Sequence, residues 1–181
     1  MQDLVELASR GDRDAFAALA STSVDRLFAI ARRILQDHHR AQDAVQSALL
    51  GAWRDLPSLR DHSRFEPWLN RLLVRACYDE ARRHRAFHAT VRLLPIEPET
   101  PDPTGWLADR DQLESAFRRL PIEQRAVVVL HFYVGLSLKE AAGVLAIPEG
   151  TARSRLHYAL RLMRGAIEAD SRAAPSEGQT A

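Results

Sequence analysis

The chain has 181 residues, of which 46% are hydrophobic and 27% are charged. This length fits one large domain or two small ones, and the apolar share is enough for a buried core. No apolar run approaches the roughly 20 residues that span a bilayer, and the acidic N-terminal segment does not resemble a signal peptide. Cys77 is the only cysteine, so an internal disulfide is excluded. We therefore expect a protein of the reducing cytoplasm without membrane insertion.

The formal net charge of +1 hides a segregated pattern. Residues 71–85 and 153–164 carry net charges of +3 and +4, whereas residues 95–115 between them carry −5. Arginine supplies 24 of the 25 basic residues. A GC-rich genome is the simplest cause of this bias, but guanidinium groups also suit bidentate contacts to phosphate and guanine. Two basic segments thus flank an acidic one.

The spacing of apolar residues predicts an all-α chain, with a short ambiguous run at 126–132 that also alternates like a strand. The helices expected in the first half lie at residues 3–9, 12–20, 24–35, 39–55 and 65–85, with a loop at 57–64. Four prolines and a glycine in 93–105 prevent a helix and favour an extended chain. We expect two small helical domains joined by a Pro-rich acidic linker, with bounds 1–87, 88–110 for the linker, 111–169, and a disordered tail at 170–181.

The strongest pattern lies in the second domain. Ser137 and Glu140 have the spacing of a capping box, which starts a helix. Residues 146–148 form a turn, and Pro148 suits the entry of a second helix at 149–167, whose buried face would include Leu160. Two short helices, a tight turn and a basic start of the second helix meet the needs of major-groove binding. An ordinary amphipathic hairpin would share the periodicity, but residues 153–164 hold four arginines and no acid.

The stretch LPIEQRAVVVLHFYVGLSLKEAAGVLAIPEGTARSRLHYALRLMR resembles region 4 of the extracytoplasmic-function (ECF) sigma factors of bacterial RNA polymerase. The motif Ile147-Pro148-x-Gly150-Thr151-x-x-Ser154-Arg155-Leu156 carries most of this resemblance. Upstream, GDRDAFAALA, LFAIARRIL, AQDAVQSALLGAW and FEPWLNRLLVRACYDEARRHRA resemble region 2 of the same family, in the same order. Gln42 and Ser47 depart from the pattern, because the family usually has acids there.

The resemblance implies an alternative sigma factor that binds core RNA polymerase, recognises the −35 and −10 elements and melts DNA. The core-polymerase set would be Gln42, Asp43, Gln46, Leu50 and Arg54. The −10 recognition and melting set would be Asp61, His62, Ser63, Arg64, Phe65, Trp68, Arg71, Arg75, Arg82 and Arg83. The −35 set would be Thr151, Arg153, Ser154, Arg155 and His157.

The implied partners are the largest and second-largest subunits of the polymerase, promoter DNA and an anti-sigma factor, with no cofactor and no metal. The acidic linker is either a solvated tether or a segment that enters the polymerase cleft.

Three other functions compete with this interpretation. A regulator could bind DNA through the helix-turn-helix without joining polymerase, but it would need neither the 43–53 helix nor the 65–83 stretch. An enzyme could be imagined around His38, His39, Cys77 and Asp79, but no ligand spacing or glycine-rich phosphate loop orders them. A purely structural helical adaptor is the third. We therefore expect no catalytic activity.

Overall fold

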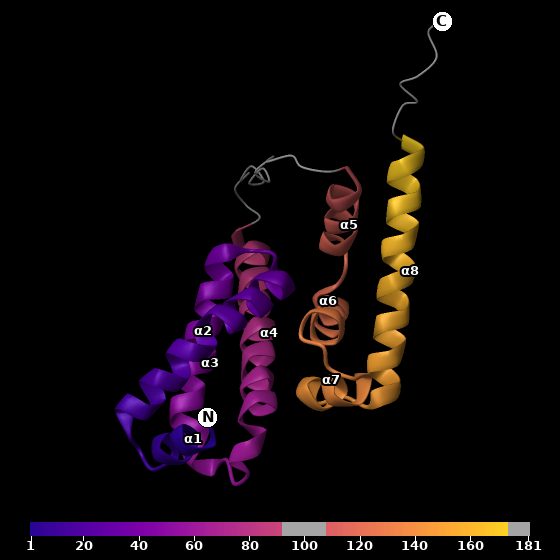
Figure 1. Cartoon of the computed structure of the whole chain (residues 1–181). Coiled ribbons are helices and arrows are strands. Elements are labelled where there is room, and N and C mark those ends of the chain that lie inside the picture. Colours follow the sequence, from indigo (N-terminus) through magenta and orange to yellow (C-terminus); the bar gives the residue numbers. More distant parts are fainter. Residues whose placement is uncertain (92–107, 174–181) are drawn as a thin grey trace, which may run out of the picture.

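The computed structural model describes residues 1–91 and 108–173, and every element within them is helical. The first half contains α1 (Gln2–Ser9), α2 (Arg13–Leu35), α3 (His38–Asp55), the short 3₁₀ turns η1 (Leu56–Ser58) and η2 (His62–Arg64), and α4 (Phe65–Val91). Helices α2, α3 and α4 lie against one another, and α1 packs at the end where α3 turns into α4 (Figure 1). These helices enclose the first apolar core.

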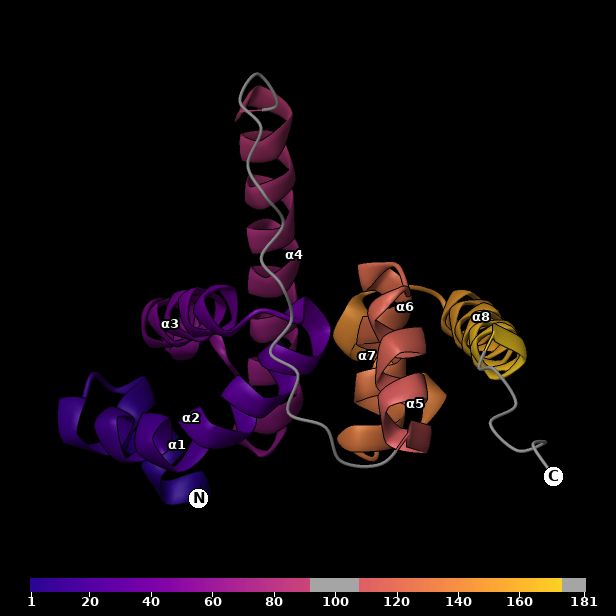
Figure 2. The ribbon, with the colours of Figure 1, turned by 90° about the horizontal axis from the view of Figure 1, so that it is seen from above.

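The second half contains α5 (Ala108–Arg118), α6 (Ile122–Val128), the π-helical turn η3 (Val129–Tyr133), α7 (Leu138–Leu145) and α8 (Glu149–Ala173). The run at 126–132, ambiguous in the sequence, is therefore helical. Gly135, with a φ of +82°, ends it in a conformation that side chains disfavour. Helices α5, α6 and α7 all pack against α8, which stands beside them as a long rod in Figure 1 and is seen nearly end-on in Figure 2.

The helix starts follow local chemistry. The Asp12 carboxylate accepts hydrogen bonds from the backbone N–H groups of Asp14 and Ala15, both at 3.0 Å. The Asp37 carboxylate accepts from the N–H of Arg40 at 2.9 Å. Each bond satisfies an amide that the first turn of a helix leaves without an intrahelical acceptor. Only Gln36, with a φ of +58°, and Asp37 separate α2 from α3, so the two helices pack back against each other.

Several expected boundaries differ from the observed ones. The break expected between 20 and 24 is absent, because this stretch holds no proline or glycine and the buried face of α2 continues through it from Leu19 to Ser23 and Leu27. Helix α4 continues to Val91, since the sequence holds neither proline nor glycine between Pro67 and Pro95. Helix α5 already begins at Ala108, so the expected linker at 88–110 is shortened at both ends.

Helix α8 likewise passes the expected end at 167 and reaches Ala173, so residues 170–173 are helical rather than disordered. No proline occurs between Pro148 and Pro175. Residues 92–107 and 174–181, which hold the rest of the expected linker and tail, lie outside the described residues.

The two halves pack against each other. Their buried apolar side chains form one continuous cluster that includes Leu73 and Val74 of α4 and Val144 and Leu145 of α7. A guanidinium N–H of Arg71 donates to the carbonyl of Gly143 at 2.6 Å. The Arg33 guanidinium lies 3.8 Å from the centre of the Tyr133 ring, within the range of a cation–π contact. Helices α2 and α4 of the first half therefore face α6, η3 and α7 of the second.

Candidate nucleic-acid interface

The helix-turn-helix expected at 137–164 is present. The Glu140 carboxylate accepts from the backbone N–H of Ser137 at 2.8 Å, and the Ser137 hydroxyl accepts from the Glu140 N–H at 3.3 Å, which completes the capping box. The Ser137 hydroxyl also donates to the Glu140 carboxylate at 2.6 Å, and this bond, together with the one from the Ser137 backbone N–H, lowers the pKa of Glu140. Ala146 ends α7 with a φ of +54°, and the Pro148 carbonyl accepts from the first free amides of α8. The turn thus holds α8 at a fixed angle to α7.

The two faces of α8 separate largely as the periodicity predicted, but Leu160, Thr151 and Arg155 depart from it. Ala152, Leu156 and Ala159 are buried, while Arg153, Ser154 and His157 are exposed. Leu160, expected in the core, is 43% exposed, because no described helix covers that side of α8. Arg153 bonds to Glu149 one turn earlier at 2.9 Å, so its guanidinium is already held along the helix surface. Thr151 and Arg155 are only half-buried and turn towards the rest of the protein.

The segment before α4 is a capped turn. The Asp61 carboxylate accepts from the backbone N–H and the hydroxyl of Ser63, which lowers its pKa. Asp61, Ser63 and Arg64 are exposed and His62 is half-buried. Phe65 is only 3% exposed and lies 6.0 Å from the half-buried Trp68 ring. The first two aromatics of α4 therefore support this turn from inside instead of offering free stacking faces.

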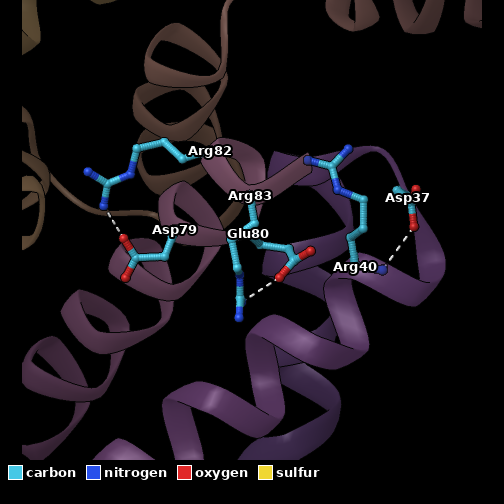
Figure 3. A network of polar contacts seen from close by, with 6 residues as sticks. All are labelled: Asp37, Arg40, Asp79, Glu80, Arg82 and Arg83. Carbon is cyan, nitrogen blue, oxygen red and sulfur yellow. Dashed lines mark hydrogen bonds and ion pairs between the residues drawn. The ribbon is translucent and has the colours of Figure 1, made fainter. Parts of the chain in front are cut away.

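The arginines of α4 lie mostly along its exposed surface. Arg82 pairs with Asp79 and Arg83 with Glu80, each one turn apart on the helix (Figure 3). Arg75 makes no hydrogen bond or ion pair with the described residues and stays exposed. The Arg26 guanidinium bridges Glu66 and the nearly buried Asn70, which ties α2 to the start of α4. This network, which spacing in the sequence does not reveal, fixes where α4 begins.

The five residues expected to meet polymerase share one surface. Gln42, Asp43, Gln46, Leu50 and Arg54 are all exposed on α3, opposite the face that Ala41, Ala44, Val45, Ala48 and Ala52 bury. Leu50 is 64% exposed, more than any other exposed leucine of the described residues. Arg54 bonds to the Asp55 carboxylate through two N–H groups, at 2.7 and 2.9 Å. The face is thus an accessible polar strip with one large apolar side chain in it.

A pocket of about 430 Å³ lies between α4 and helices α6, α7 and α8 of the second half. It brings Arg71 and Arg75, expected at the −10 element, to the same cavity as Arg155, expected at the −35 element. Tyr78 also lines it, and burial raises the pKa of this phenol to about 12. Tyr78 was not predicted from the sequence, because nothing in its spacing distinguishes it from the other residues of an amphipathic helix.

Comparison with known proteins identifies the family of the chain. Residues 19–87 match the family model of sigma-70 region 2, and residues 110–163 match that of sigma-70 region 4. The ECF RNA polymerase sigma factor SigM of Mycobacterium tuberculosis is 37% identical over 145 residues, which cover 80% of this chain and 73% of SigM. The chain belongs to the ECF sigma factor family. It therefore directs promoter-specific transcription initiation when bound to RNA polymerase, and its relatives are known as non-catalytic regulators.

Other ECF relatives and solved structures cover nearly all of the chain. The RNA polymerase sigma-E factor of Streptomyces coelicolor is 31% identical, with 90% of this chain and 93% of that protein covered. CnrH, solved in complex with the cytosolic domain of CnrY, superposes with a TM-score of 0.67 at 26% identity, covering 93% and 97% of the two chains. RpoE of Bartonella quintana, solved with the anti-sigma factor NepR, gives 0.68 at 25% identity, covering 86% and 98%.

Within the described residues of this sigma factor, no helix is long and apolar enough to cross a membrane. The same residues hold no group of three or more His, Cys, Asp or Glu side chains that could bind a metal ion. Cys77 is fully buried, and burial raises the pKa of its thiol to about 12.

Proposed function

We propose that this cytoplasmic sigma factor uses three separate surfaces during initiation. The exposed strip of α3 docks on the largest subunit of core polymerase, the turn at 61–64 with α4 binds the −10 region, and α8 reads the −35 element in the major groove. The observation that carries the proposal is the exposure of the expected contact residues on separate helices. All five α3 residues are exposed, as are Arg153, Ser154 and His157 at the start of α8, on different helices of the two matched regions.

The −35 role rests on the geometry of α7 and α8. A recognition helix enters the major groove with its first turns against the base edges. Arg153, Ser154 and His157 are exposed in those turns, and Thr151 lies at their start. Arginine contacts guanine through a bidentate pair of hydrogen bonds, the commonest base-specific contact. Arg155 can make such a contact only after it leaves the pocket beside Tyr78.

The −10 role rests on the capped turn and the basic surface of α4. A flipped base needs a pocket and a nearby cation. Asp61, His62, Ser63 and Arg64 form the turn, and Arg71, Arg75, Arg82 and Arg83 follow on α4. Phe65 and Trp68 act here from the core, by holding the turn in place. Melting requires no bond chemistry, because preferential binding of single-stranded bases shifts the opening equilibrium.

The two promoter contacts cannot be made at the same time in the packed arrangement. The two elements lie about 25 base pairs apart, which is about 85 Å at about 3.4 Å per base pair. Arg75 and Arg155 instead line one small pocket. The two regions must therefore separate on promoter DNA. An anti-sigma factor that holds them together would block initiation. RpoE of Bartonella quintana is solved in complex with the anti-sigma factor NepR, and CnrH in complex with the cytosolic domain of CnrY.

Run-off transcription tests the proposal. The purified chain with core polymerase should initiate at a defined start site on promoter DNA, whereas core polymerase alone should not. If the chain binds the DNA but cannot direct core polymerase to a start site, it is a DNA-binding regulator instead. Parallel reactions that contain the chain but no polymerase, analysed for their products, would reveal any enzymatic activity of the chain itself.

A further inference from the structure

The pocket between the two regions is rich in positive charge. Its lining includes five arginines but only two acids, Asp79 and Glu123. The arginines are Arg71, Arg75, Arg82 and Arg85 from α4 and Arg155 from α8. Asp79 is already paired with Arg82. An excess of about three positive charges therefore remains around one pocket, and these like charges repel one another.

The pocket also offers hydrogen-bond donors without acceptors. The Tyr78 hydroxyl is buried and has no hydrogen-bond partner in the described part of the chain. Arg75 and Arg155 likewise make no hydrogen bond or ion pair with the described residues, and Arg155 is half-buried. A buried polar group without a partner is costly, so it calls for an explanation such as a missing ligand. The ligand that fits must supply acceptor atoms and negative charge.

The remaining lining is apolar. Val74 of α4, Ile122 of α6, and Val144 and Leu145 of α7 are all buried and form part of the wall. A volume of about 430 Å³ suits a small organic molecule, within the range of about 300–1,000 Å³ for ligand sites. A DNA duplex is far too large to enter. The wall thus combines a surface for a planar apolar group with guanidinium groups that suit phosphate oxygens.

We propose that this pocket binds a small phosphate-bearing anion of nucleotide size, held by Arg75 and Tyr78 from region 2 and by Arg155 from region 4. Such a ligand bridges the two regions and stabilises their packed arrangement. Because that arrangement cannot span a promoter, the ligand opposes promoter binding. This regulatory consequence rests on the proposed roles of α4 and α8, whereas binding itself does not.

Titration calorimetry with three probes tests the site: inorganic tripolyphosphate, GTP and ATP. The expected result is saturable binding of one molecule per chain and a melting temperature that rises with probe concentration. Tighter binding of the nucleotides assigns the apolar wall to a base, and equal binding of tripolyphosphate assigns the site to the phosphate chain alone. Absence of saturable binding of all three probes at millimolar concentration would overturn the proposal.

Tyr78→Phe gives a sharp second arm. The substitution keeps the ring and removes a hydroxyl that lacks a partner, so the free protein should melt at the same or a higher temperature. The same change should weaken probe binding severalfold, because the hydroxyl then no longer meets a phosphate oxygen. Unchanged affinity in Tyr78→Phe would remove the phenol from the site and contradict the proposal as stated.

Matched arginine variants exclude general attraction to a basic protein. Arg75→Gln and Arg155→Gln should each weaken binding by about tenfold or more, the usual effect of losing a charge-assisted hydrogen bond. Arg161→Gln is the control, since Arg161 is exposed on the same helix α8 but stacks on Tyr158 outside the pocket. Equal losses in all three variants would overturn the site. Run-off transcription without any probe tests the sigma function separately, so the two failures are distinguishable.

Discussion

Leu50 offers the sharpest test of the polymerase-binding face of α3. It is 64% exposed in the free chain, although leucine is normally buried. Complete burial of a leucine side chain contributes about 1.5–3 kcal/mol, so docking that covers the exposed share contributes about 1–2 kcal/mol. Leu50→Ala should therefore weaken binding to core polymerase by about 5- to 30-fold. The fold should be unaffected, because the removed atoms lie outside the core.

Competition binding measures this effect. A labelled wild-type chain is bound to core polymerase and displaced by unlabelled variants, while circular dichroism checks that each variant stays helical. Leu7→Ala is the matched control, because Leu7 is another exposed leucine of the first half of the chain, at 46%, but lies on α1. Wild-type affinity of Leu50→Ala, or an equal loss in Leu7→Ala, would refute the assignment of the α3 face.

Four further predictions concern the helix-turn-helix and the core. Ser137→Ala should lower the free energy of unfolding by about 1 kcal/mol in urea titrations, because α7 loses its cap. Since the pKa of Glu140 is lowered on folding, its contribution is present above the ordinary value of 4.5 and is lost as pH falls through the folded pKa, so Glu140→Gln should flatten the acid limb of the stability curve. Arg155→Ala should weaken −35 binding by about 1–3 kcal/mol if Arg155 reads a base, and an equal loss on unrelated DNA would assign it to phosphates. Cys77 should react with a thiol reagent at pH 8 only after unfolding, and rapid labelling of the native chain would contradict its burial.

The positions of most helices were predictable from the sequence because helix formation depends on neighbours three and four residues apart. The capping box of Ser137 and Glu140, the turn at Pro148 and the buried stripe of α3 follow from such local spacing. Boundaries were less predictable. The helix ends at Val91 and Ala173 continue past their expected positions, since a helix stops only where a breaker or a lost packing partner makes it stop.

The sequence by itself therefore determined the all-α class, the two sigma regions and the three candidate surfaces. Only the tertiary structure decided which of their residues meet. It placed Phe65 in the core, left Leu160 exposed and brought Arg75, Tyr78 and Arg155 to one pocket. The physical reason is that a periodic pattern records which side of a helix is apolar, whereas the partner of that side comes from segments dozens of residues away. Contacts between distant segments depend on how whole helices pack, and no local spacing encodes them.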